Sequence, residues 1–244
     1  MRQRISLILI LSSCLLMDAP ADPRLPSLTP DPPYVTSQAC QTCHPKEYAS
    51  WHRTYHRTMT QAATPESVAG KFDGTTIVSD GLAYRVFHEG SELKAEMPDP
   101  DVMMYIVQGG LKTPFSKVPR IELPVVMSTG SHHYQTYWVA SKRYEGLLQT
   151  LPLVYLIDDK RWVPREAAFL RGPSDRGRII TQWNHHCIQC HSTAGNPGLD
   201  DATGMLKSRV AELGISCEAC HGPGQPHVEN QTALLREADR KSVV

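Results

Sequence analysis

The sequence predicts an α+β fold, with helical segments and loops near both ends of the chain and a small antiparallel β module inserted at about residues 70–165. Two observations lead to this prediction. Three Cys-x-x-Cys-His motifs stand at residues 40–44, 187–191 and 217–221. The stretch between the first two motifs is instead rich in β-branched and aromatic residues and is punctuated by glycines, as strands and their turns are.

Each Cys-x-x-Cys-His motif is an attachment signature for c-type haem. Its two thiols lie about one helical turn apart, so they reach both vinyl groups of one porphyrin, and the following histidine binds the iron. The sequence therefore predicts three covalent haem c groups, around which the helices and loops pack. The cysteines that would bind them are Cys40, Cys43, Cys187, Cys190, Cys217 and Cys220, and the proximal iron ligands are His44, His191 and His221.

A zinc site is the main alternative for these cysteines. Cys187 and Cys190 with Cys217 and Cys220 would make a plausible four-cysteine site. That alternative leaves Cys40 and Cys43 without a second pair, and it does not explain why a histidine follows every pair. A thioredoxin-like redox motif needs a neighbouring βαβ pattern, and none is visible. The pattern favours haem.

The N-terminus is typical of a signal peptide over residues 1–21. Basic Arg2 and Arg4 precede a short apolar run at 5–17, and a small-residue cleavage site ends at Ala21. Cys14 offers an alternative, a lipoprotein processing site, and the protein would be attached to a membrane only in that case. Either route predicts export, to the periplasm or beyond. The six remaining cysteines all belong to the motifs, which leaves none for a disulfide.

Beyond the signal peptide we expect a proline-rich spacer at 22–37 and one multihaem domain at 38–244. After the first motif, apolar or aromatic residues recur at helical spacing from Tyr48 to Met59, which predicts a helix there. A second helix is expected at 227–240.

The β module is predicted from strand-like runs between glycine-containing turns. The sequence Glu89-Gly90 separates two of these runs as a hairpin turn would. The expected strands lie at 75–78, 82–88, 91–97, 103–108, 134–140 and 147–157.

The charge of the chain gives no support for a nucleic-acid partner. The 25 basic and 25 acidic residues balance, and no basic stripe is present.

Taken together, these motifs resemble multihaem c-type cytochromes of the cytochrome c-554 type, over most of residues 38–230. The matching stretches are 39–44 followed by Trp51 and His56, then 130–138, 151–153 with 162–165, and 187–191 through 217–227. The resemblance implies haems packed against one another and electrons passing between them, with no bond-making chemistry. The family pattern often continues further and cytochrome c-554 carries four haems, so the chain is either a shortened relative or part of a longer protein.

The second axial ligand of each iron decides the function, because histidine there makes an electron carrier and an open position lets a small molecule react. His56 occupies the position that the family uses for a distal ligand. His227 follows a Gly-Pro-Gly turn that would fold it over a neighbouring haem. For the third haem we expect His133, with His132 and His185 in reserve.

The sequence thus predicts an exported electron-transfer cytochrome, served by redox partner proteins or membrane quinone-linked oxidoreductases. The alternative is a multihaem oxidoreductase that acts on a small inorganic nitrogen or sulfur compound at an open haem. The sequence does not decide whether the protein is an enzyme, but the surplus of histidines favours a non-enzymatic carrier. A sensory or scaffolding domain that uses haem for stability alone is a weaker possibility.

Overall fold

The computed structural model describes residues 22–169 and 181–242. The expected signal peptide, Cys14 included, lies outside these residues. The strands are β1 Thr60–Ala62, β2 Asp73–Ser79, β3 Leu82–Glu89, β4 Glu92–Pro98, β5 Arg120–Thr129, β6 Tyr134–Ala140, β7 Leu148–Leu156, β8 Arg161–Pro164, β9 Ser192–Thr193 and β10 Glu212–Leu213. The helices are α1 Ser37–Gln41, α2 Pro45–Trp51, α3 Pro100–Val107, α4 Arg165–Ala168, α5 Trp183–His186, α6 Ile188–His191, α7 Cys217–His221 and α8 Gln225–Ser242, with a 3-10 turn η1 at Phe115–Lys117.

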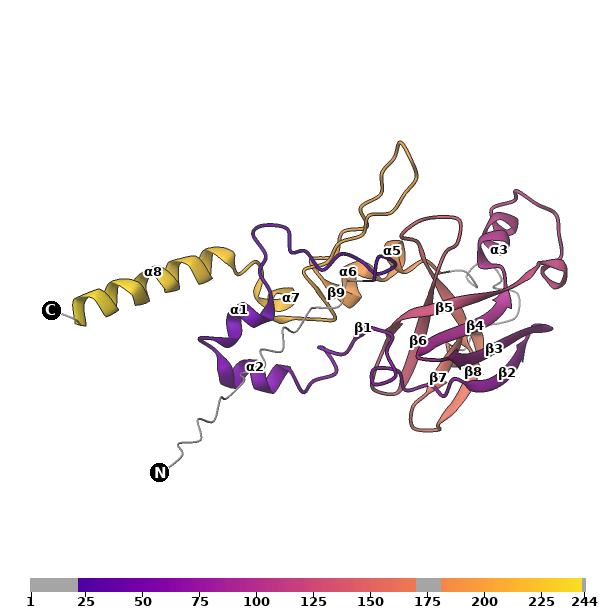
Figure 1. Ribbon diagram of the computed structural model, residues 1–244, viewed down its shortest axis with the longest axis horizontal. Coiled ribbons are helices and arrows are strands. Elements are labelled where there is room, and N and C mark those ends of the chain that lie inside the picture. Colours follow the sequence, from indigo (N-terminus) through magenta and orange to yellow (C-terminus); the bar gives the residue numbers. More distant parts are fainter. Residues whose placement is uncertain (1–21, 170–180, 243–244) are drawn as a thin grey trace, which may run out of the picture.

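One large antiparallel sheet forms most of the molecule. Strands β2 to β8 follow one another in sequence order, and β1 pairs with β5 outside that path. The sheet is strongly curved, and its two outermost strands, β2 and β8, are in contact. The sheet therefore nearly closes into a barrel (Figure 1). The short strands β9 and β10 form a separate pair next to the motif helices.

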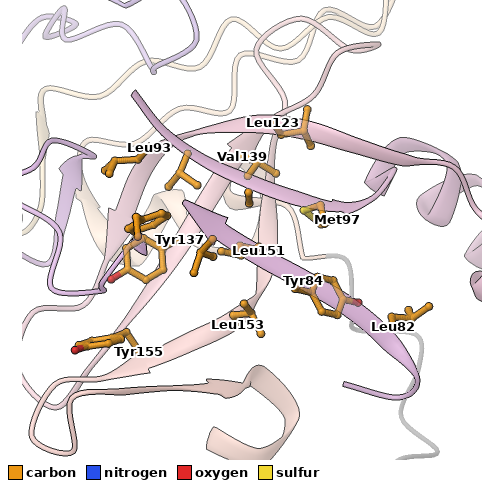
Figure 2. Packing of buried hydrophobic residues seen from close by; sticks show 14 of the residues in the cluster. Leu82, Tyr84, Leu93, Met97, Leu123, Tyr137, Val139, Leu151, Leu153 and Tyr155 are labelled. Carbon is orange, nitrogen blue, oxygen red and sulfur yellow. The ribbon is translucent and has the colours of Figure 1, made fainter. Parts of the chain in front are cut away.

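The main hydrophobic core lies inside this curled sheet. Alternate residues of each strand point inward, as the two-residue period of a strand requires. Tyr137 and Val139 from β6 meet Leu151, Leu153 and Tyr155 from β7 in the packing that Figure 2 shows, and all five are almost completely buried.

A second, smaller core lies on the outer face of β5, β6 and β7. Trp138, the β6 residue between Tyr137 and Val139, points to this side. It belongs to the same cluster as Met127 and Leu148 from the sheet and Trp183 and Ile188 from α5 and α6. This contact fixes the second Cys-x-x-Cys-His motif against the sheet.

The expected fold class is therefore wrong. The β module is not a small insertion among helices packed around haems; the sheet is the body of the protein, and the helices other than α8 are short. The reason is the distribution of apolar side chains. The larger core lies within the sheet, whereas none of the described residues of α2 and α8 is buried.

Some individual elements differ from expectation for local reasons. The strand expected at 103–108 is the helix α3, because Asp99 caps its N-terminus by accepting from the backbone N–H groups of Asp101 and Val102, and Pro100 suits the first turn. The helix expected through Met59 ends at Trp51. The strands expected at 75–78, 82–88, 91–97, 134–140 and 147–157 and the C-terminal helix are confirmed.

The long helix α8 extends away from the rest of the molecule, at the end opposite the sheet (Figure 1). Among the residues that the structure describes, no helix combines the length and the apolar character needed to cross a membrane.

Candidate functional site

In each motif the first cysteine and the histidine lie about one helical turn apart, although only the third motif lies entirely within one helix, α7. In the first, the backbone N–H of His44 donates to the carbonyl of Cys40 at 2.9 Å, and in the second His191 donates to Cys187 at 2.9 Å. In every motif the first cysteine is half-buried and the second is exposed, and all six thiols are free. One helical turn thus presents two thiols and a histidine on one side, which is the arrangement that haem attachment needs.

The first and third motifs lie side by side. Helices α1 and α7 are in contact, as Figure 1 also shows. The pKa of the Cys40 thiol is raised to about 11, first by burial and then by the neighbouring Cys217 thiol. Two porphyrins attached to these thiols would therefore lie close to one another.

The ring of the predicted proximal ligand His44 lies near the ring of the predicted distal ligand His227. Their ring centroids are 6.2 Å apart, and the ring planes differ by 26°. Imidazole nitrogens bind metal ions at about 2 Å, so two rings on opposite sides of one metal have centroids about 6 Å apart. The spacing of His44 and His227 fits an iron between them.

His56 lies next to the third motif. Its backbone carbonyl accepts a hydrogen bond from the N–H of Ile215 at 2.9 Å, two residues before Cys217. The Trp51 indole N–H donates to the Ile215 carbonyl at 2.8 Å, so the segment that carries His56 is held there at two points. Gly214 allows this close approach, since a Cβ at its position would lie 2.3 Å from the Arg57 carbonyl oxygen.

A cavity of about 340 Å³ opens at the second motif. Cys187 and His191 line one side of it, and His132 and His133 from the loop before β6 line another. The remaining lining is largely aromatic and apolar, as suits a porphyrin. These lining residues include Tyr55, Met59, Tyr134, Trp138 and Phe169.

Burial sets the chemistry of the second motif. It lowers the pKa of His191, which favours the neutral imidazole that a metal requires. The Nδ1 atom of His191 is buried and has no hydrogen-bond partner among the described residues. The pKa of the Cys187 thiol is raised to about 11, mainly by burial. The cavity, the Cys187 thiol beside it and the neutral imidazole of His191 together fit a covalently attached haem.

The two adjacent histidines of this cavity have different environments. His132 lies between the Tyr55 ring, at 4.1 Å between centroids, and the His133 ring, at 3.8 Å. The Nδ1 atom of His133 lies 3.3 Å from a carboxylate oxygen of Asp158, which leaves Nε2 available to a metal. His185, the other reserve, is on α5 and is not part of the cavity lining.

The described residues, which include all six motif cysteines, contain no group of three or more His, Cys, Asp or Glu side chains arranged to hold a metal ion. The four cysteines of the zinc alternative therefore do not gather into one site.

Sequence reasoning missed the groups that hold the first and third motifs together. Glu212 accepts from the backbone N–H and the hydroxyl of Ser37 at 2.8 and 2.6 Å, and Glu218 accepts from the N–H groups of Val35 and Gly224. For Glu218 the only signal in the sequence was its place inside a haem motif. Its partner Val35 is 183 positions away, and its partner Gly224 lies in the turn that follows the motif.

Comparison with known proteins identifies the motif-bearing segments. The family model described as cytochrome c554 and c-prime matches residues 39–77 and 170–222, which contain all three motifs and His56. No curated protein matches the chain.

Two solved structures are similar over most of the chain. The outer cell wall cytochrome OcwA is 19% identical, with a TM-score of 0.48, over 82% of this chain and 34% of that one. An undecaheme cytochrome from the S-layer of Carboxydothermus ferrireducens is 20% identical, with a TM-score of 0.40, over 84% of this chain and 22% of that one. The chain thus spans about a third or less of the length of these two proteins.

The family match falls on the same residues that carry the Cys-x-x-Cys-His geometry. The chain therefore resembles the cytochrome c554 and c-prime family over these motif-bearing residues.

Proposed function

We propose that the protein is an exported electron-transfer cytochrome with three covalent haems, each bound by two histidines. The proposed pairs are His44 with His227, His221 with His56, and His191 with His133. The observation that carries the proposal is that each candidate distal histidine lies beside a different motif. Haem supplies a one-electron iron couple when it is bound.

The chain's own residues would determine how that couple behaves. A neutral imidazole on each side closes the position that a reacting molecule would need, which favours electron transfer over catalysis at iron. The contact between α1 and α7 supports electron exchange between the haems of the first and third motifs. The exposed second cysteine of each motif supports a haem edge that redox partner proteins can approach. We propose that the electron donor and the electron acceptor are redox proteins or quinone-linked oxidoreductases of the membrane.

The number of haems is tested by mass spectrometry. The full chain, made with haem-attachment machinery and exported, should gain the mass of three haems and lose the N-terminal residues 1–21. Fewer than three additions would contradict the proposal, and retention of the N-terminus or acylation of Cys14 would contradict cleavage after Ala21.

The axial ligands are tested one at a time. His56→Ala and His227→Ala should each convert one haem from low-spin to high-spin and create carbon monoxide binding that the parent lacks. His88→Ala is a matched control, because His88 is an exposed histidine on β3, away from the motifs. A substantial high-spin fraction in the parent would contradict the carrier and favour an open haem.

A further inference from the structure

We infer that Glu218, inside the third motif, is a positioning residue that holds His227 opposite His44. The inference rests on the proposed function, because it takes these two histidines to share one haem. Glu218 itself would touch neither iron nor porphyrin in this role; it acts through the backbone of the segments that carry the ligands.

One carboxylate oxygen of Glu218 joins three parts of the chain. The side chain belongs to α7, and the residue is only 4% exposed. Its Oε1 atom accepts from the backbone N–H of Val35 at 2.9 Å and from that of Gly224 at 2.7 Å. Val35 precedes α1 and the first motif, and Gly224 immediately precedes α8, which carries His227. The glutamate thus ties both halves of the His44–His227 pair to the third motif.

The turn before His227 is shaped around this carboxylate. Gly222 has a φ of +79°, a conformation that favours glycine. A Cβ on Gly224 would lie 3.2 Å from both the Glu218 Oε1 atom and the Val35 Cγ2 atom. The Gln225 N–H donates to the Pro33 carbonyl at 3.0 Å, which fastens the first residue of α8 to the same N-terminal segment. The start of α8 therefore has its position fixed from two sides.

The second oxygen of Glu218 adds no further anchor among the described residues. Oε2 is buried and lacks a hydrogen-bond partner within the described part of the chain. Burying a carboxylate is costly unless hydrogen bonds compensate it. The two backbone hydrogen bonds to Oε1 are the compensation present here, so the glutamate and the two segments hold each other in place.

Helix α1 has its own separate anchor in Glu212, which binds Ser37. Loss of Glu218 should therefore release mainly the His227 side of the pair, because α1 stays attached through Glu212. This predicts a specific defect at one haem.

The test uses the haem-loaded full chain and compares Glu218→Ala with His227→Ala. Both variants should show one newly high-spin haem that binds carbon monoxide, and added imidazole should return that haem to the low-spin form. The double variant should open no further haem. Glu218→Gln should resemble the parent, because the amide oxygen accepts the same two N–H groups. Glu229→Ala is the control, since Glu229 is an exposed α8 glutamate that accepts a hydrogen bond from the Gln225 side chain of its own helix.

The outcomes separate the inference from the proposed function. If His227→Ala opens a haem and Glu218→Ala has the parent spectrum, the inference is overturned and the ligand assignment stands. If Glu218→Ala opens several haems, its role is general and the inference is overturned. If His227→Ala changes nothing, the ligand assignment fails and the inference fails with it. If the Glu218→Ala protein does not fold and bind haem, the Glu218→Asp variant tests the inference instead. Its shorter side chain should open the same haem in part. A Glu218→Asp spectrum equal to that of the parent overturns the inference.

Discussion

At the scale of single residues, the choice between His132 and His133 is set by what each ring contacts. His132 lies between two rings, whereas His133 has its Nδ1 atom beside Asp158. A carboxylate at Nδ1 orients a histidine and makes its other nitrogen a better metal ligand. The same contact suggests that Asp158 tunes the haem of the second motif.

We therefore expect His133→Ala to open the haem of the second motif, and His132→Ala to leave it low-spin. Asp158→Asn should keep the haem low-spin but raise its reduction potential, because a weaker acceptor at Nδ1 makes His133 a poorer donor to iron. Spin state and carbon monoxide binding measure the first effect, and a redox titration measures the second. The reverse result for the two histidines would make His132 the ligand.

The residue types of the candidate site could be predicted from the sequence, and their pairing could not. Cysteines and proximal histidines are fixed by short-range spacing, which a sequence displays directly. The segments that carry His44 and His227 are joined by the hydrogen bonds of Val35 with Glu218 and of Gln225 with Pro33, and such long-range contacts follow no local pattern. The distal ligands thus stay predictions until spectra test them.

At the scale of elements, strands in which apolar and polar residues alternate regularly could be predicted from the sequence. Elements whose identity depends on one capping residue or one proline could not. The β3–β4 hairpin was visible from its Glu89-Gly90 turn. Strand β5 was missed because it contains Pro124, which normally argues against a strand inside a sheet. Helix α3 was missed because its apolar run reads as a strand until Asp99 is recognised as a cap.

Strand β7 offers the clearest stability test, because almost all of its residues are buried. Leu151→Ala should lower the free energy of unfolding by about 2–5 kcal/mol, since the cavity left in the core adds to the lost burial. Val78→Ala on β2 is the control. Val78 is 64% exposed, so its change should stay within about 0.5 kcal/mol. Denaturant unfolding of the haem-loaded protein measures both, and equal effects would contradict the packing of Figure 2.

At the scale of the whole molecule, the sheet and the motif segments differ in what holds them together. The sheet encloses a continuous core made mainly of its own side chains. The motif helices α1 and α7 and the long helix α8 are small or exposed, and their described residues bury little. The sequence predicted helices and loops packed around the haems, whereas the larger core of the structure lies within the sheet.

Removing the haem of the second motif should therefore destabilise the region around α5 and α6 and leave the sheet folded. In the Cys187→Ser, Cys190→Ser double variant, strands β2 to β8 should keep their resistance to protease, because their core contains no haem-binding residue among its members. New cleavage should appear near α5 and α6, because the haem that would fill the cavity beside Cys187 and His191 is then absent. Limited proteolysis followed by mass spectrometry locates the cuts.

Cys43→Ser, which changes an exposed thiol of the first motif, is the control and should leave α5 and α6 protected. Cleavage throughout the sheet in the double variant would show that porphyrin supports the whole fold.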